Sequence, residues 1–219
     1  MSARLLNVVA HLSCGGHYKM AKKGALVAGL ARALGMPEGQ ISLFYRFLSE
    51  AELITSTGAR GVNAPDLTEL DCARMVIALL ATERPSSAPQ AVYDFARLPM
   101  TGSYHFPNDG REAIVEDPAT PTTAVDFLAA FIRELASLPA NEAERRCWLA
   151  WIRCTPRVVQ IEVFPGNGKT VCFDDSAAFE TPDGQARMSR YFRRLDVTRS
   201  VIGPTIADIA AIFRAQPNG

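Results

Sequence analysis

The sequence predicts an α+β fold, with a helical amino-terminal part and a smaller carboxy-terminal part that contains a β-hairpin. Three observations predict this class. Apolar residues recur at helical spacing through much of the first 82 residues. Residues 84–123 are rich in Pro, Gly, Ser, Asp and Asn, with only a short helical possibility at "APQAVYDFARL", which is typical of a connector. Apolar and polar residues alternate beside the turn "PGNGK", which predicts two paired strands.

The length of 219 residues and the 48% hydrophobic content are enough to bury a core in one or two domains. We expect a first domain over residues 1–83, a connector over residues 84–119 and an α+β dimerisation or sensing domain over residues 120–219. No apolar run reaches the roughly 18 residues of a membrane span, and the start lacks the pattern of a signal peptide. We therefore expect a cytoplasmic protein.

Three helices are predicted in the first 51 residues. Apolar spacing indicates the first over residues 3–12 and the second within "KKGALVAGLARALG", where Gly35 is the residue that helices often need just past their end. Pro37 can start the third, over residues 38–51, because its missing N–H is not needed there. The stripe of this helix that should face inward contains Ile41, Phe44, Tyr45 and Leu48.

A short two-stranded turn and a fourth helix should follow. The glycines of "TSTGARGVNA", residues 55–64, indicate a turn between two short strands. Thr68 can cap the next helix, and Asp71 adds favourable charge to its first turn. This helix should run to about residue 82.

The carboxy-terminal part should contain three helices and a hairpin. "TTAVDFLAAFIRELASL" and "ERRCWLAWIRC" have helical spacing, and "TIADIAAIFRA" predicts a closing helix. "RVVQIEVF" and "TVCFDD" predict the hairpin, and "RYFRRLDVTRSVIG" can add a strand. The apolar faces of the first and last helices predict that residues 120–219 hold a dimer together.

The formal net charge is zero, but the charge is unevenly distributed along the chain. Residues 1–62 contain seven Lys and Arg against three Glu, residues 63–144 contain five basic against thirteen acidic residues, and residues 145–219 contain eleven against seven. The amino-terminal part is therefore basic. Since a polyanion responds to the local field of a protein, this distribution is compatible with binding to nucleic acid.

"ALVAGLARALGMPEGQISLFYRFLSEAELI" followed by "TSTGARGVNA" resembles the winged helix-turn-helix domains of bacterial transcription regulators. The resemblance implies that residues 38–51 form the recognition helix, that Gln40, Ser42 and Arg46 face the major groove, and that residues 55–64 form the wing. The position before Leu53 departs from the pattern, because such domains commonly have Gly where this chain has Glu52.

The chemistry of these side chains agrees with that assignment. Arg46 can pair with guanine and Gln40 with adenine, whereas Ser42 suits a phosphate contact. Arg60 lies between two glycines and can reach a phosphate or the minor groove. Exposed Leu43 suits a thymine methyl group or a protein partner. The predicted DNA-binding residues are Lys22, Lys23, Gln40, Ser42, Leu43, Arg46 and Arg60.

A second basic segment lies near the carboxy terminus. Its arginines can form a secondary DNA-binding surface, although a solvated helix or strand face beside the acidic middle of the chain is the commoner outcome for such a cluster. These secondary candidates are Arg187, Arg190, Arg193 and Arg194.

Metal, cofactor and thiol chemistry have little support. His11, Cys14 and His17 are residue types that bind zinc, but no fourth ligand is nearby, so we expect no metal site. The five cysteines contain no CxxC pair, and nothing brings Cys147 or Cys154 to a histidine. "PGNGK" lacks the spacing of a phosphate loop. We expect neither a cofactor nor enzymatic activity.

The favoured hypothesis is a sequence-specific transcription regulator, more specifically a repressor, that binds double-stranded DNA as a homodimer. A small-molecule or protein effector would control this binding. Two heads are expected because one recognition helix reads too few base pairs for selectivity. A protein-interaction adaptor built from the same helices, and a replication or recombination factor with the same head, remain alternatives.

Overall fold

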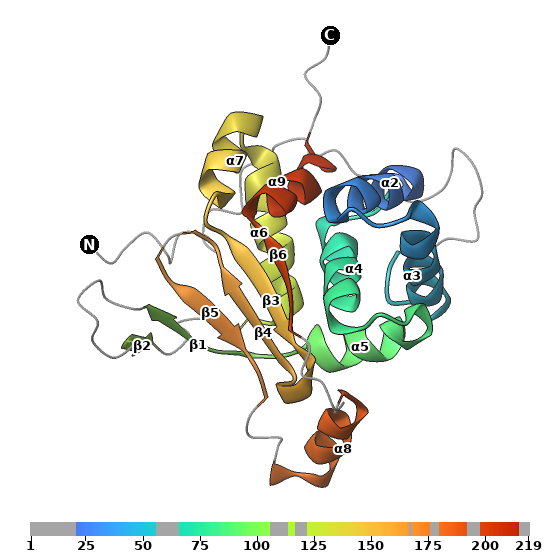
Figure 1. Cartoon of the computed structure of the whole chain (residues 1–219), viewed down its shortest axis with the longest axis vertical. Coiled ribbons are helices and arrows are strands. Elements are labelled where there is room, and N and C mark those ends of the chain that lie inside the picture. Colours follow the sequence, from blue (N-terminus) through green and yellow to red (C-terminus); the bar gives the residue numbers. More distant parts are fainter. Residues whose placement is uncertain are drawn as a thin grey trace.

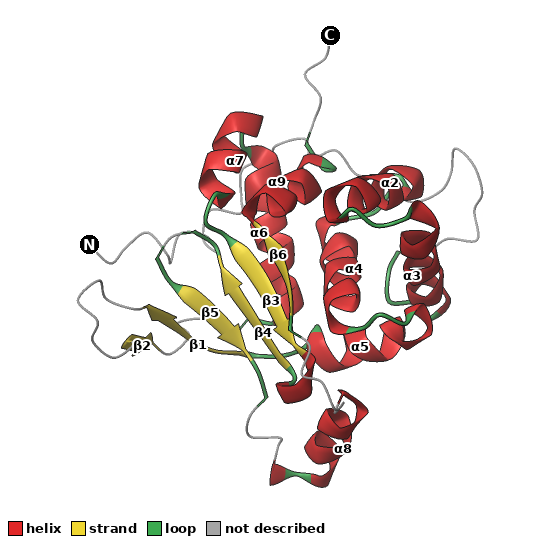
Figure 2. Ribbon diagram, viewed as in Figure 1, coloured by secondary structure: helices red, strands yellow, loops and turns green. Residues whose placement is uncertain are grey.

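A cluster of four helices lies beside a six-stranded sheet, and further helices cover one side of that sheet (Figure 1). Figure 2 shows the helical region and the strands as neighbouring parts of the molecule. The predicted α+β class is confirmed. The computed structural model describes residues 21–55, 66–105, 114–116, 122–166, 168–175, 180–191 and 198–214.

Helices α2 and α3 pack against each other and are joined by a very short turn. Helix α2 spans Lys23–Leu34 and ends at Gly35, which has the left-handed φ of 64°. Helix α3 spans Glu38–Glu50 after the capping residue Pro37, so the predicted helix over residues 38–51 is confirmed to within one residue. The predicted inward stripe of α3 is also confirmed, since its buried residues are Ile41, Phe44, Tyr45 and Leu48.

The end of α3 contains a backbone strain that glycine would relieve. Glu52 has a φ of 57°, a left-handed conformation that side chains with a Cβ disfavour. Its N–H donates to Ser49 O at 3.1 Å, and Leu53 N–H donates to Leu48 O at 2.9 Å. These two bonds form the Schellman motif that usually places glycine at this position. The departure seen in the sequence is therefore accommodated by a strained residue.

We expect Glu52→Gly to raise the free energy of unfolding by about 0.5–1 kcal/mol, because glycine adopts φ near 57° without the Cβ clash. The matched control is Gly35→Ala at the end of α2, where φ is 64° and no atom lies within 4 Å of the added Cβ. That change should lower stability by about 1 kcal/mol through backbone strain alone. Urea denaturation measures both. A loss of stability in Glu52→Gly would show that its side chain contributes more than the strain removes.

Helix α4, which spans Glu69–Ala81, is buried along almost its whole length. It starts with the predicted Thr68 cap, in which the side chains of Thr68 and Asp71 each accept a hydrogen bond from the backbone N–H of the other residue. On one side α4 contacts α3 and α5, and on the other it contacts α6 and the sheet. This position makes α4 the common core helix of both parts of the molecule.

The sheet is antiparallel throughout, with strand order β2-β1-β5-β4-β3-β6. The predicted hairpin is confirmed, because β4 and β5 pair on either side of the "PGNGK" turn. The strands are β1 (Met100–His105), β2 (Ile114–Glu116), β3 (Trp151–Thr155), β4 (Gln160–Phe164), β5 (Thr170–Phe173) and β6 (Arg199–Ile202).

Two segments differ from the sequence-based expectation. The expected connector over residues 84–119 contains the short helix η2 (Pro85–Ser87), β1 and β2, and it also contains α5 (Ala88–Phe95), the helix that "APQAVYDFARL" indicates. The sequence of β1 contains Gly and Ser and does not indicate a strand, but β1 pairs through its backbone with β5. The helix predicted for "ERRCWLAWIRC" ends early, since α7 spans Ala140–Cys147 and the chain then enters β3. Pairing of β3 with both β4 and β6 overrides its helical spacing.

The remaining helices are α6 (Ala124–Ser137), α8 (Pro182–Tyr191) and α9 (Gly203–Ala211). In the view of Figure 1, α6 lies behind the sheet. It packs on β5 through Phe127 and Phe173, whose ring centroids are 5.4 Å apart. Helix α9 contacts α2, α6 and α7. The apolar faces of α6 and α9, which predicted a dimer, are therefore used inside the chain's own core.

Strand register divides the sheet residues between two faces. The inner face, toward α4 and α6, contains the buried residues Ile152, Cys154, Ile161, Val163, Val171, Phe173 and Val201. The outer face contains Trp151, Arg153, Glu162, Phe164, Ser200 and Ile202. Buried side chains of the helical region and of the inner face form one continuous hydrophobic core.

Candidate nucleic-acid interface

Helix α3 presents to solvent a stripe that we call the α3 stripe, formed by Gly39, Leu43, Arg46 and Glu50. The spacing of four, three and four residues places them on one face of a helix, opposite the buried stripe. Leu43 is 43% exposed, which makes it one of the large apolar side chains left open to solvent. The α3 stripe therefore offers an apolar contact beside a charged one.

Arg46 is held by two contacts on its own helix. Its Nε lies 3.3 Å from Glu50 Oε1, and its guanidinium lies 5.1 Å from the ring centroid of Phe47. The side chains of Arg46 and Glu50 are 58% and 59% exposed, so solvent screens the pair and its energy is small. Arg46 can exchange this partner for another acceptor at little cost.

Gln40 and Ser42 flank the α3 stripe and are half-buried, so they are less accessible than Arg46. The two predicted lysines lie at the start of α2. Lys22 Nζ is 2.8 Å from Asp66 Oδ1, and Lys23 Nζ lies 4.8 Å from the ring centroid of Tyr45 on α3. Burial, followed by the charge of Asp71, raises the pKa of the Tyr45 hydroxyl. Lys23 thus lies beside α3, whereas Lys22 contacts the segment that precedes α4, and both lysines are exposed.

The predicted wing lies outside the described residues except for Thr55, and so does Arg60. Both ends of the intervening segment are nevertheless fixed by one buried carboxylate. Asp71 Oδ1 accepts from Thr55 N–H at 2.9 Å, and Asp71 Oδ2 accepts from Thr68 N–H at 2.8 Å. Both threonine hydroxyls donate to the same carboxylate. We call this arrangement the Asp71 clamp.

Two further contacts hold the base of that segment against the helices. Ala21 and Leu67 exchange backbone hydrogen bonds of 3.1 and 2.8 Å. Arg74 Nη1 donates to Leu53 O at 2.7 Å, so α4 also holds the chain where it leaves α3. Thr55 and Thr68, which are described residues, are therefore held together at the start of α4.

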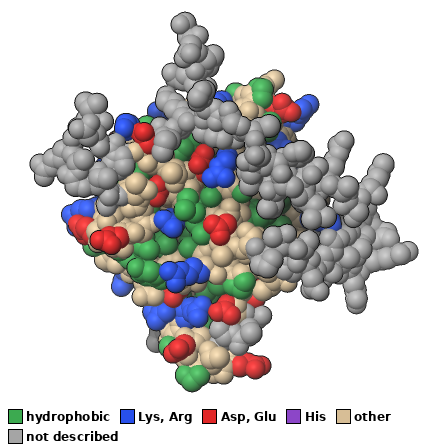
Figure 3. All heavy atoms as spheres, turned by 180° about the vertical axis from the view of Figure 1, so that it is seen from behind, with side chains coloured by type: hydrophobic (Ala, Val, Ile, Leu, Met, Phe, Trp, Pro, Cys, Tyr) green, Lys and Arg blue, Asp and Glu red, His purple; other side chains and the backbone are tan. Residues whose placement is uncertain are grey.

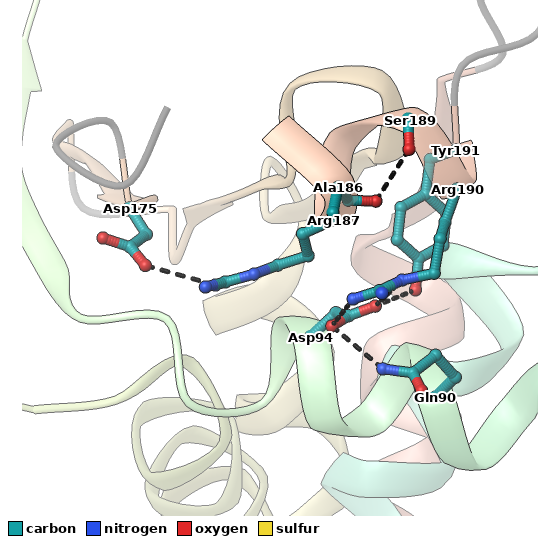
Figure 4. A network of polar contacts seen from close by, with 8 residues as sticks. All are labelled: Gln90, Asp94, Asp175, Ala186, Arg187, Ser189, Arg190 and Tyr191. Atoms are coloured by element: carbon teal, nitrogen blue, oxygen red, sulfur yellow. Dashed lines mark hydrogen bonds and ion pairs between the residues drawn. The ribbon is translucent and has the colours of Figure 1, made fainter. Parts of the chain in front are cut away.

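The described secondary arginines have acidic partners within the chain (Figure 4). Arg190 donates to the buried carboxylate of Asp94 through Nη2 at 2.9 Å and Nε at 3.3 Å. Tyr191 donates to Asp94 Oδ2 at 2.8 Å, and Gln90 donates to Oδ1 at 3.1 Å. Burial, together with the hydrogen bond to Asp94, raises the pKa of Tyr191. This network joins α8 to α5.

Arg187 likewise lies 3.1 Å from Asp175, whereas Arg193 and Arg194 lie outside the described residues. On the face turned away from the viewer in Figure 1, basic and acidic side chains are interspersed (Figure 3). The charges of Arg187 and Arg190 on α8 are therefore compensated by acidic side chains of the same chain.

Three of the described cysteines, which are buried, are poor nucleophiles. Cys72, Cys147 and Cys154 are buried and Cys172 is partly buried. Burial raises the pKa of all three buried thiols, that of Cys147 to about 11, so they are protonated near neutral pH. His11, Cys14 and His17 lie outside the described residues, and no group of three or more metal-ligand side chains occurs within them. None of the helices described is long and apolar enough to cross a membrane.

Sequence reasoning identified Arg46 and Leu43 but missed two features beside them. The pairing of Arg46 with Glu50 follows from their spacing of four residues and was open to prediction. The cap formed by Thr68 and Asp71 was predicted, but its second link to Thr55 spans sixteen residues and has no sequence signature. Comparison with family models, curated proteins and solved structures found no match for this chain.

Proposed function

We propose that this protein is a sequence-specific DNA-binding transcription regulator that places α3 in the major groove. The observation that carries the proposal is the α3 stripe together with the Asp71 clamp. An exposed helix face follows a tight two-helix corner, and one carboxylate holds both Thr55 and Thr68, between which the sequence predicts the wing. A groove-reading helix with an adjacent wing requires this order of elements.

The side chains of the α3 stripe suit base edges better than the phosphate backbone. Arg46 can donate to guanine O6 and N7, and Leu43 can contact the methyl group of thymine. Glu50 would repel phosphate, so its presence on this face disfavours purely electrostatic binding. Two copies reading two half-sites would supply the selectivity that one helix lacks, which supports a homodimer as the binding species.

A protein-interaction adaptor is the second candidate, and exposed Leu43 beside a neutral ion pair favours it. Such a surface buries readily against another protein. The two functions differ in their response to DNA. We would therefore select bound fragments from a random duplex library with the full chain and measure affinity for the recovered sequence and for random duplex at several salt concentrations.

On the selected duplex we expect Arg46→Ala to weaken binding by about 1–3 kcal/mol and to flatten sequence preference, because a base contact is lost. Glu50→Gln should strengthen binding to random duplex, because a negative charge leaves the helix face and Arg46 loses its partner. Fluorescence anisotropy measures both. The matched control is Arg145→Ala on α7, where Arg145 is 82% exposed and also pairs with a glutamate of its own helix.

The DNA proposal fails if the folded wild-type chain recovers no preferred sequence. It also fails if Arg46→Ala and Arg145→Ala change affinity equally, because the contact would then be non-specific. Failure to select any sequence, together with a protein partner lost on Leu43→Asp, would favour the adaptor.

A further inference from the structure

The largest exposed apolar side chains of the described residues gather at one corner of the sheet. Trp148 is 73% exposed and Leu149 66% exposed, where α7 ends and β3 begins, and Ile202 on β6 is 60% exposed. Register makes Trp151 the direct neighbour of both Ile202 and Phe164 on the outer face. We call the five residues Trp148, Leu149, Trp151, Phe164 and Ile202 the corner patch.

Two parts of the corner patch are brought together by the fold. The rings of Trp151 and Phe164 stack with centroids 6.0 Å apart, and the guanidinium of Arg153 lies 4.6 Å from the Trp151 ring centroid. A Cβ added to Gly203, next to Ile202, would collide with the carbonyl oxygen of Cys147, so the end of β6 closely approaches the end of α7. Trp148 and Leu149 follow directly after that end of α7.

This surface is comparable to the largest apolar patch of a typical monomer. Side chains exposed to the extent of Trp148, Leu149 and Ile202 present together on the order of 400 Å² of apolar area, and patches of this size often have a function. Burying the same area on two copies accounts for about half of the roughly 1,600 Å² in a standard interface. The polar rim can supply the rest.

The rim indicates which partner fits. Arg153 on β3 lies 3.6 Å from Glu162 on β4, and the Arg153 guanidinium also lies over the ring of Trp151. This pair brings both signs of charge to the corner patch. A rim of one sign would repel its own copy, whereas a rim of alternating sign can complement itself across a two-fold axis.

We propose that two copies of this chain associate through the corner patch, with the outer faces of their sheets packed against each other. Sheets pack face to face through such alternating apolar positions. The inference rests on the proposed function in one respect. Because DNA recognition needs two heads, a second copy of this chain is preferred over another protein as the partner. It moves the predicted dimer contact from the buried helices α6 and α9 to the outer face of the sheet.

The chain contains two tryptophans, and both belong to the corner patch, so wild-type protein reports on this surface directly. Sedimentation equilibrium over a wide concentration range should show a dimer. Tryptophan emission should shift to shorter wavelength over the same range, because association removes the exposed Trp148 ring from water. In Trp151→Phe, where Trp148 alone reports, the shift should persist.

Leu149→Asp should raise the dimer dissociation constant at least tenfold, since a charge would replace a buried apolar contact. The matched control is Leu43→Asp on α3, which should leave association unchanged. Circular dichroism verifies that both variants fold, and the wild-type emission decides the question if Leu149→Asp does not. A monomer at every concentration overturns the inference, and so does a dimer whose tryptophan emission does not change.

DNA binding is measured separately from association. A dimer that associates through the corner patch but selects no DNA sequence would contradict the proposed function and leave this inference standing. A chain that selects DNA but stays monomeric would do the reverse.

Discussion

Gly203→Ala should destabilise the protein by about 3 kcal/mol or more, enough to leave much of a marginally stable chain unfolded. An ideal Cβ on Gly203 would lie 1.7 Å from Cys147 O and 3.2 Å from the carbonyl carbon of Trp148. Both neighbours are backbone atoms, so no side-chain rotation can relieve the clash. The junction between β6 and α9 must move away from α7 to make room.

The control for this substitution is Gly24→Ala in α2, where no atom lies within 4 Å of the added Cβ. Alanine there should raise stability by about 0.5–1 kcal/mol through its better helix propensity. Thermal and urea unfolding give both values. If Gly203→Ala unfolds like the wild type, the close approach of α9 to the end of α7 is wrong.

Asp71→Ala should lower the free energy of unfolding by about 3–5 kcal/mol. Its carboxylate is fully buried and accepts from the backbone N–H groups of Thr55 and Thr68. Removing it leaves two donors without a partner, at about 1–3 kcal/mol each, and removes one half of a capping box. Both anchors of residues 56–65 are lost together.

Asp126→Ala is the matched control, because Thr123 and Asp126 form a similar cap at the start of α6. That aspartate is exposed, and its hydrogen bonds are local, so we expect a loss of only about 1 kcal/mol. Urea denaturation distinguishes the two variants. Equal effects would mean that the link from Asp71 to Thr55 adds nothing to an ordinary cap.

The parts of the fold that local signals determine were predictable. Gly35, Pro37 and the cap formed by Thr68 and Asp71 mark helix boundaries through backbone chemistry that operates within a few residues. The turn "PGNGK" marks its hairpin in the same way, with Gly166 and Gly168 at φ values of 78° and 89°. These elements need no distant partner to be recognised.

The errors lie where a distant partner decides. Trp151 and Ile152 continue the helical spacing of α7, yet pairing with β4 and β6 makes them a strand. β1 has Gly102 in its centre and becomes ordered through β5, which lies about 70 residues further along the chain. Such pairings depend on which strands meet in space, and a single sequence does not show which strands will pair.

The candidate site divides in a similar way. Helical spacing predicts that Arg46 and Leu43 are exposed, and both are. It also predicts that Gln40 and Ser42 face outward, but both are half-buried beside neighbouring side chains. The acidic partners of Arg187 and Arg190 come from other segments, so their compensation could not be inferred from a count of charges.

The placement of α4 limits how this chain can be recombined with other proteins. One side of α4 completes the packing of α3 and α5, and its other side lies on α6 and β3. Arg199 on β6 also donates to Leu80 O near its end. A cut after α4 would strip the sheet of its covering helix, and a cut before it would leave α3 without support. The helical region α2–α5 therefore cannot be transferred to another protein as an independent domain. Substitutions in the sheet must stay compatible with the helices that pack on it.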